Sequence, residues 1–263
     1  MKAIVALAAA LWLAAVPAWA QQVVDLPSRP GVTERMLVLP NSSASATVLL
    51  LTGGSGHVNI KDSGQIARAE NFLVRTRERF RQEGFNVLVL DAPSDHGARP
   101  YLGGGFRDSA EHVADLGAVV HWARQQFGLP VWIVGTSRGT QSAAHAAEVL
   151  APPAGPDGIV LTSTILLRSP RGGDQGRPVP EMDLGRIAVP VLVVHHEQDP
   201  CPICQPGQLP GLMKRFAPGR AELKTYTGGD SQGPACEPWS HHGYNGIEDR
   251  VVADIAAWIR QHQ

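Results

Sequence analysis

The segment Val131–Thr140, with the sequence VWIVGTSRGT, constrains the fold more than any other part of this 263-residue chain. It begins with a short apolar run rich in β-branched residues, which is typical of a strand buried on both faces of a parallel sheet. A turn with one serine between two glycines follows the run. Alanines then favour a helix with a small packing face: Ala143, Ala144, Ala146 and Ala147. The segment therefore predicts a strand, a sharp turn and a helix in immediate succession.

The turn, Gly135-Thr136-Ser137-Arg138-Gly139, matches the G-x-S-x-G pattern of a nucleophile elbow. Such a turn pushes the serine hydroxyl out of a crowded backbone, and the two glycines leave room for the strand to meet the helix. The N-terminus of the helix then points at the serine and favours negative charge there. The pattern alone also fits a tight glycine turn with an unreactive serine, so Ser137 needs partners elsewhere in the chain.

The N-terminus begins with Met1-Lys2, continues with the apolar run Ala3–Val16 and reaches Ala18-Trp19-Ala20. This pattern predicts a secretory signal peptide at residues 1–20, cleaved after Ala20. The apolar run is too short for a transmembrane helix, and no later stretch is long enough to span a bilayer. We therefore expect an exported protein, periplasmic or secreted, with no membrane span after cleavage.

The remaining residues, 21–263, suit one domain with a large core, and they contain no repeat or linker. Lys2 is the only charged residue of the signal. The chain after it therefore carries 22 basic and 24 acidic side chains, a net charge of −2 with the histidines neutral. This balance gives no reason to expect a nucleic-acid partner.

Apolar runs predict strands that alternate with helices along most of the chain. Strands are expected at residues 33–39, as an edge strand, and at 47–51, 85–91, 131–134, 158–162, 189–194 and 221–226. Helices are expected at residues 66–83, at 109–127, after the serine turn and at 247–260. The alternation predicts a doubly wound, mostly parallel α/β sheet, with ligands bound beyond the carboxyl ends of its strands.

Two residues downstream of the serine turn have the order that a serine nucleophile needs, an acid and then a histidine. Asp199 follows the buried strand at 189–194, and His242-Gly243-Tyr244 precedes the last helix. With these residues, the serine turn and the turn Leu51-Thr52-Gly53-Gly54, the chain resembles the α/β hydrolases over essentially all of residues 21–263. The resemblance implies the α/β-hydrolase fold, a mostly parallel doubly wound sheet flanked by helices. The family often inserts a cap at the place of residues 164–187, which are few here, so no large cap domain is expected.

Carried over residue by residue, the resemblance implies that Ser137 is the nucleophile and that His242 acts as general base and then general acid. Asp199 would orient the imidazole and stabilise its charged form. His242 is preferred over His241 because a histidine followed by glycine and an aromatic residue matches the family, and His241 is expected at the rim. Glu197 is the alternative acid.

The resemblance also implies an oxyanion hole made of two backbone N–H groups. Arg138 supplies the first. Gly54 supplies the second, with Ser55 the next choice, because Thr52-Gly53 stands where the family often has His-Gly. The expected activity is cleavage of a carboxylic ester or related acyl bond in a small molecule, through an acyl-enzyme. The alternatives are an acyltransferase with the same triad and a non-catalytic periplasmic binding protein on this fold.

The three cysteines, Cys201, Cys204 and Cys236, all lie in the last third of the chain. An exported protein favours a disulfide, and the odd count leaves one thiol. A bridge from Cys204 or Cys201 to Cys236 would tie the acid loop to the histidine loop. We predict a bridge to Cys236, with Cys204–Cys236 as the first choice and Cys201–Cys236 left open, and with Cys201–Cys204 as the alternative to a bridge of that kind. No metal or cofactor is expected, because three cysteines without paired spacing make a poor zinc set and the glycine-rich turn lacks the Walker spacing and lysine.

Other polar residues near the predicted site have a structural explanation. His195 and His196 are expected to fill or cap the end of their strand. Arg168, Arg171 and Arg177 are expected to be solvent-exposed loop charges rather than an anion site.

Overall fold

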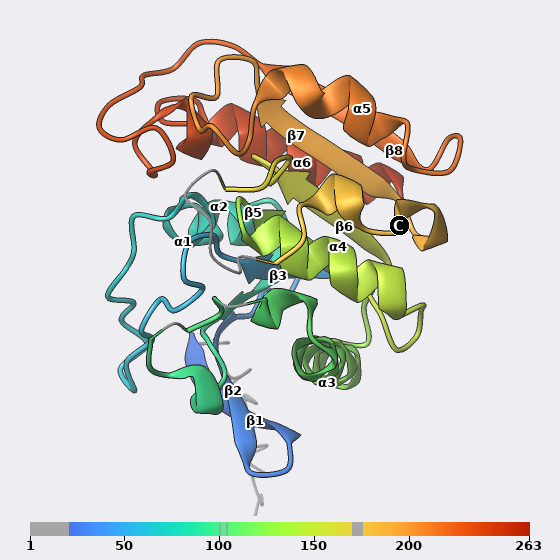
Figure 1. The fold of residues 1–263 in the computed structure, drawn as a ribbon. Helices are drawn as coiled ribbons and strands as arrows, with labels where there is room; N and C mark the ends of the chain where they lie inside the picture. Colours follow the sequence, from blue (N-terminus) through green and yellow to red (C-terminus); the bar gives the residue numbers. More distant parts are fainter. Residues whose placement is uncertain (1–20, 100, 104, 170–175) are drawn as a thin grey trace, which may run out of the picture.

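The computed structural model describes residues 21–99, 101–103, 105–169 and 176–263, so the predicted signal peptide at 1–20 and Arg171 lie outside the described residues. The centre of the molecule is an eight-stranded sheet with the order β1-β2-β4-β3-β5-β6-β7-β8 (Figure 1). The strands are β1 (Gln22–Arg29), β2 (Val32–Leu39), β3 (Ala46–Leu51), β4 (Phe85–Leu90), β5 (Val131–Thr136), β6 (Gly158–Thr162), β7 (Val191–His196) and β8 (Ala221–Tyr226).

The strand pairings confirm a mostly parallel sheet. β1 with β2 and β2 with β4 are antiparallel, and every other pair is parallel. The prediction of an edge strand at 33–39 is wrong, because β1 pairs along β2 and forms the edge itself. No residue of β1 is fully buried, and the strand contains Pro27, so it lacks the apolar run that revealed the other strands.

Helices cover both faces of the sheet (Figure 1). They are α1 (Phe72–Arg75), α2 (Arg77–Gln82), α3 (Ala110–Phe127), α4 (Gly139–Val149), α5 (Leu209–Met213) and α6 (Glu248–Gln261). Residues of α3, α4 and α5 pack in one apolar cluster, and residues of α1, α2 and α6 pack in a second. β5 supplies both, with Val131 and Ile133 in the first cluster and Trp132 and Val134 in the second. This alternation is the reason why the strand reads as apolar throughout.

The helix predicted at 66–83 is shorter than expected and interrupted. Asn71 caps α1 through its side chain, which accepts a hydrogen bond from the N–H of Leu73, so the helix begins only at Phe72. Thr76 separates α1 from α2, and its hydroxyl donates to the Phe72 carbonyl at 2.7 Å. Such side-chain bonds to the backbone compete with regular helix formation.

The segment where a cap would be inserted contains, in its described part, only the 3₁₀ helices Val179–Glu181 and Leu184–Arg186. The expectation of no large cap domain is therefore confirmed for the described residues. Within the same ranges, no helix combines the length and apolar character that crossing a bilayer demands.

Candidate active site

Ser137 directly follows β5 and has a φ of 52°, in the left-handed region that side chains rarely adopt. Its carbonyl accepts hydrogen bonds from the N–H and the hydroxyl of Thr140, at 2.9 and 2.6 Å. A Cβ atom at Gly139 would collide with the Leu51 carbonyl, and one at Gly135 would collide with the backbone of Gly139. The sequence therefore forms the predicted strand, turn and helix, with glycines where backbones meet.

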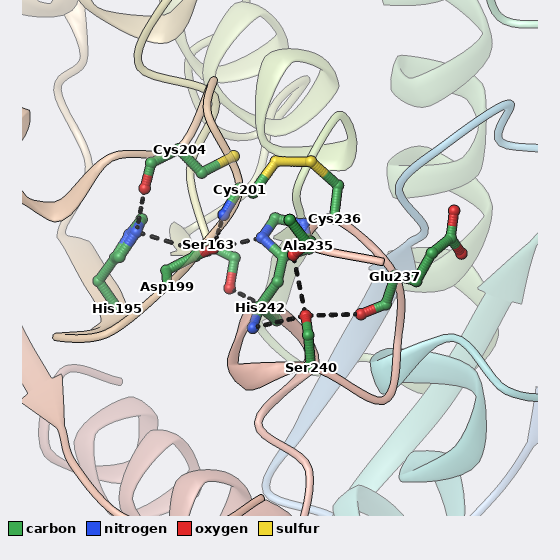
Figure 2. Close-up of a disulfide and its surroundings, with 10 residues drawn as sticks. All are labelled: Ser163, His195, Asp199, Cys201, Cys204, Ala235, Cys236, Glu237, Ser240 and His242. Carbon is green, nitrogen blue, oxygen red and sulfur yellow. Dashed lines mark hydrogen bonds and ion pairs between the residues drawn. A yellow bond between two sulfur atoms is a disulfide. The ribbon is translucent and has the colours of Figure 1, made fainter. Parts of the chain in front are cut away.

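Asp199 follows β7, is 6% exposed and binds three partners (Figure 2). One carboxylate oxygen accepts the N–H of Cys201 at 2.9 Å. The other lies 2.9 Å from Nδ1 of His242 and 3.4 Å from Nε2 of His195. Burial by itself raises the pKa of the Asp199 carboxyl, but hydrogen bonds from His195 and His242 outweigh burial and lower the pKa to about 2. The carboxylate is therefore ionised at neutral pH.

The backbone of the histidine loop holds His242 against this carboxylate. Its carbonyl accepts the hydroxyl of Ser163 at 2.7 Å, and its N–H donates to the hydroxyl of Ser240 at 3.2 Å (Figure 2). The hydroxyl of Tyr244 donates to the Val194 carbonyl in the second half of β7, at 2.9 Å. The loop is thus fastened to the residue that follows β6 and to the second half of β7.

The free nitrogen of His242 is positioned to act as a base. A carboxylate only accepts hydrogen bonds, so Nδ1 carries the hydrogen toward Asp199. The remaining nitrogen, Nε2, is buried and has no hydrogen-bond partner among the described residues. Such a nitrogen can take a proton from a group placed beside it.

Ser137 and His242 line one cavity of about 150 Å³. Three segments form its walls: the glycine-rich loop after β3, the residues around the start of α1, and the histidine loop. The lining residues include Thr52, Gly53, Gly54, Ser55, His57, Val58, Arg68, Glu70, Asn71, Phe72, Cys236, Glu237, Pro238 and Gly243. In the described part of the chain no hydrogen bond joins the Ser137 hydroxyl to His242. In ligand-free active sites this bond is often long and tightens only with substrate.

Two backbone N–H groups beside the serine are available to a ligand. Within the described ranges, neither the N–H of Gly54 nor that of Arg138 makes a hydrogen bond. Gly54 has a φ of 58°, and the N–H of Gly56 donates to the Gly53 carbonyl at 3.1 Å, which closes the turn. Successive N–H groups in such a turn form an anion-binding concavity.

A buried arginine, which sequence analysis missed, supports this loop from behind. Arg107 is 2% exposed; its guanidinium donates to the Thr52 carbonyl at 3.1 Å and to the hydroxyl of Ser142 at 2.8 Å. Burial lowers the pKa of Arg107 to about 9, with a further contribution from the charge of Arg138. No sequence motif marks Arg107, because its partners, the Thr52 carbonyl and Ser142 of α4, lie far from it along the chain.

The alternative site residues lie elsewhere. Glu197 is exposed and accepts the hydroxyl of Thr225 at 2.8 Å. The ring of His241 stacks on that of His196 at 4.2 Å, so the structure brings His242 rather than His241 to Asp199.

The loop arginines with described side chains are paired with acidic residues. Arg168 pairs with Glu181, and Arg177 pairs with Glu148 at 3.2 Å and with Asp108 at 3.6 Å. This pairing agrees with loop charges rather than with an anion site.

The disulfide joins Cys201 to Cys236, so the predicted bridge to Cys236 is confirmed and its first-choice pairing, Cys204–Cys236, is wrong (Figure 2). Cys204 is a buried free thiol. The N–H of Cys201 binds Asp199, which places its side chain beside the histidine loop, whereas the Cys204 sulfur lies on the side of the Cys201 sulfur away from Cys236 (Figure 2). The bridge still ties the acid loop to the histidine loop, as either pairing with Cys236 would.

Comparisons with known proteins place the fold. No protein-family model matches the sequence, and no curated protein matches it. Solved structures do match. A dienelactone hydrolase from Anabaena variabilis is 15% identical, with a TM-score of 0.65, and the match covers 92% of this chain and 98% of that one. An esterase from Pyrococcus furiosus is 15% identical, with a TM-score of 0.68 and coverage of 97% and 96%. A monoglyceride lipase variant from Saccharomyces cerevisiae is 15% identical, with a TM-score of 0.62 and coverage of 95% and 97%. The chain therefore has the α/β-hydrolase fold.

Proposed function

We propose that the protein is a serine esterase in which Ser137, His242 and Asp199 form the catalytic triad. One observation carries the proposal: a buried Asp199–His242 pair leaves a free imidazole nitrogen in the cavity that contains the strained Ser137. A serine turn without a reactive serine would need neither the buried Asp199–His242 hydrogen bond nor the orphaned nitrogen.

In the proposed reaction, Nε2 of His242 takes the hydroxyl proton of Ser137 as the oxygen attacks the acyl carbonyl. The ionised Asp199 stabilises the resulting imidazolium, and the N–H groups of Gly54 and Arg138 bind the oxyanion. His242 then gives the proton to the departing alcohol, which leaves an acyl-enzyme. Water then attacks the acyl-enzyme. His242 takes a proton from the water and gives it to the Ser137 oxygen, which releases the acid and restores the free serine.

The cavity favours a short acyl group. Its volume of about 150 Å³ is below the roughly 300–1,000 Å³ of typical drug-sized ligand sites. Its walls mix apolar residues, Val58 and Phe72, with the charged residues Arg68 and Glu70. The names of the structural neighbours, which include esterases, agree with ester substrates. Among p-nitrophenyl esters we expect kcat/KM to be highest for acetate or butyrate and to fall for octanoate.

Labelling with a fluorophosphonate probe tests the proposal. Wild type should be labelled, Ser137→Ala and His242→Ala should not, and the matched control His241→Ala should be labelled as wild type is. A folded wild type that takes no label would refute the esterase proposal and leave the binding-protein alternative. Product analysis in the presence of an added alcohol separates the other alternative, because an acyltransferase would form the new ester in preference to the free acid.

We further propose that residues 1–20 are an export signal and that residues 21–263 fold as one periplasmic or secreted domain. The disulfide supports this proposal, because such bonds persist in oxidising compartments. N-terminal sequencing of protein recovered from the periplasm or the medium should begin at Gln21, and a chain that still begins at Met1 would contradict the proposal.

A further inference from the structure

The free thiol of Cys204 lies beside the disulfide. The sulfur atoms of Cys204 and Cys201 and a ring nitrogen of His242 are all within 4.8 Å of one another. Figure 2 shows the Cys204 sulfur directed at the Cys201 sulfur, on the side away from Cys236. Disulfides exchange when a thiolate attacks one sulfur and displaces the other. The Cys204 sulfur therefore lies on the side from which attack would displace Cys236.

The backbone also suits a bridge between Cys201 and Cys204. The N–H of Cys204 donates to the Cys201 carbonyl at 2.9 Å, which closes a four-residue turn. Such turns hold their first and last Cα atoms within about 7 Å, and disulfides span Cα distances of about 4.4–6.8 Å. His195 fixes the turn, because its Nε2 donates to the Cys204 carbonyl at 2.8 Å. The turn thus keeps the two cysteines in bridging range.

The two possible partners of Cys201 differ in their surroundings. Cys204 is fully buried and packs with Ile165, whereas Cys236 is exposed and lines the cavity that contains Ser137. Among the described residues, the charged and titratable groups around Cys204 are Asp199, Arg138 and His242, together with His195 on the Cys204 carbonyl. Burial and the negative charge of Asp199 raise the pKa of the Cys204 thiol well above its usual value. Only a small fraction is thiolate at neutral pH, so exchange is slow there.

We propose that Cys204 exchanges with the active-site disulfide. The Cys204 sulfur attacks Cys201, the Cys201–Cys236 bond breaks, and a Cys201–Cys204 bond forms. The proton that Cys204 loses ends on the Cys236 sulfur, so the step is an isomerisation that consumes no oxidant or reductant. The product carries an exposed Cys236 thiol at the cavity and no covalent link between the acid loop and the histidine loop. If Ser137 and His242 catalyse ester cleavage as proposed above, this product has lower esterase activity.

Trypsin places the cysteines on two peptides, which makes the exchange measurable. Residues 187–214 contain Cys201 and Cys204, and residues 225–250 contain Cys236. Purified wild type is incubated at pH 8.5, quenched with acid, denatured, blocked with N-ethylmaleimide at mildly acidic pH and digested without reductant. The starting form gives the two peptides linked, with the maleimide on Cys204. The exchanged form gives a free peptide 187–214 with an internal disulfide and the maleimide on Cys236.

We expect the exchanged form to grow over hours, as disulfide reshuffling does, above the level in a sample quenched at time zero. Cys204→Ser should keep its linked peptides throughout. In a second sample, a glutathione redox buffer brings the two disulfide forms to equilibrium even if direct attack by Cys204 on Cys201 is slow. Absence of the internally bridged peptide from both samples would overturn the proposal. Because mass spectrometry alone reads the exchange, an inactive protein would refute the esterase proposal without affecting this result.

Discussion

Removing the Cys201–Cys236 bridge should lower the free energy of unfolding by about 4 kcal/mol. The bridge joins positions 35 residues apart and therefore restricts the unfolded chain to a closed loop of that size. The chain-entropy relation gives such a loop an entropy loss of about 13 cal/mol/K, which is about 3.8 kcal/mol at 25 °C. The melting temperature should fall by roughly 8–16 °C, since each kcal/mol shifts a domain of this size by a few degrees.

The comparison needs a background in which Cys204 cannot replace the lost partner. The double variant Cys204→Ser/Cys236→Ser is therefore measured against Cys204→Ser, which keeps the bridge. Urea unfolding should show a lower midpoint and a larger m-value for the double variant, because its unfolded chain is more expanded. A difference below about 1 kcal/mol, with the bridge verified in the parent by mass spectrometry, would refute the entropic reasoning.

Three further predictions concern the acid and the turn. Asp199→Asn should lower kcat on a short ester by up to about 10⁴-fold, because the imidazole of His242 loses its orienting carboxylate. The control Glu197→Gln, on the exposed side of the same loop, should leave this kcat unchanged. The pKa of Asp199, lowered from 3.8 to about 2, implies that about 2 kcal/mol of stability is present above pH 4 and is lost toward pH 2. Urea unfolding at pH 5 and pH 2 should therefore show a loss of stability that is about 2 kcal/mol smaller in Asp199→Asn than in wild type. Gly139→Ala should lower the melting temperature sharply, because its Cβ would meet the Leu51 carbonyl, whereas Gly207→Ala, with open space around it, should not.

Sequence patterns predicted most of the strands, both buried ones such as β6 and the largely exposed β8. The strands at 158–162 and 221–226 have the predicted bounds, and the serine turn lies between strand and helix as expected. Other exposed features, and those that depend on long-range contacts, gave no such signal. No residue of β1 is fully buried, so no apolar run marks this strand. The disulfide uses Cys201 rather than Cys204 because the Cys201 N–H bonds to Asp199, which turns its side chain toward the histidine loop. The contact of His195 with the same carboxylate likewise follows from the turn after β7 rather than from any spacing.

One wall of the cavity contains none of the groups proposed to do the chemistry. Arg68, Glu70, Asn71 and Phe72 precede or begin α1, whereas the nucleophile, the acid and the histidine are set by strand ends and by the loop fastened to them. Phe72 packs on Tyr244 of the histidine loop, but Arg68 and Glu70 are exposed. Substitutions of Arg68 and Glu70 can therefore change which acyl or alcohol group fits without disturbing the reacting atoms. Among descendants of this chain, or in a directed-evolution library, substrate preference should diverge first at Arg68 and Glu70.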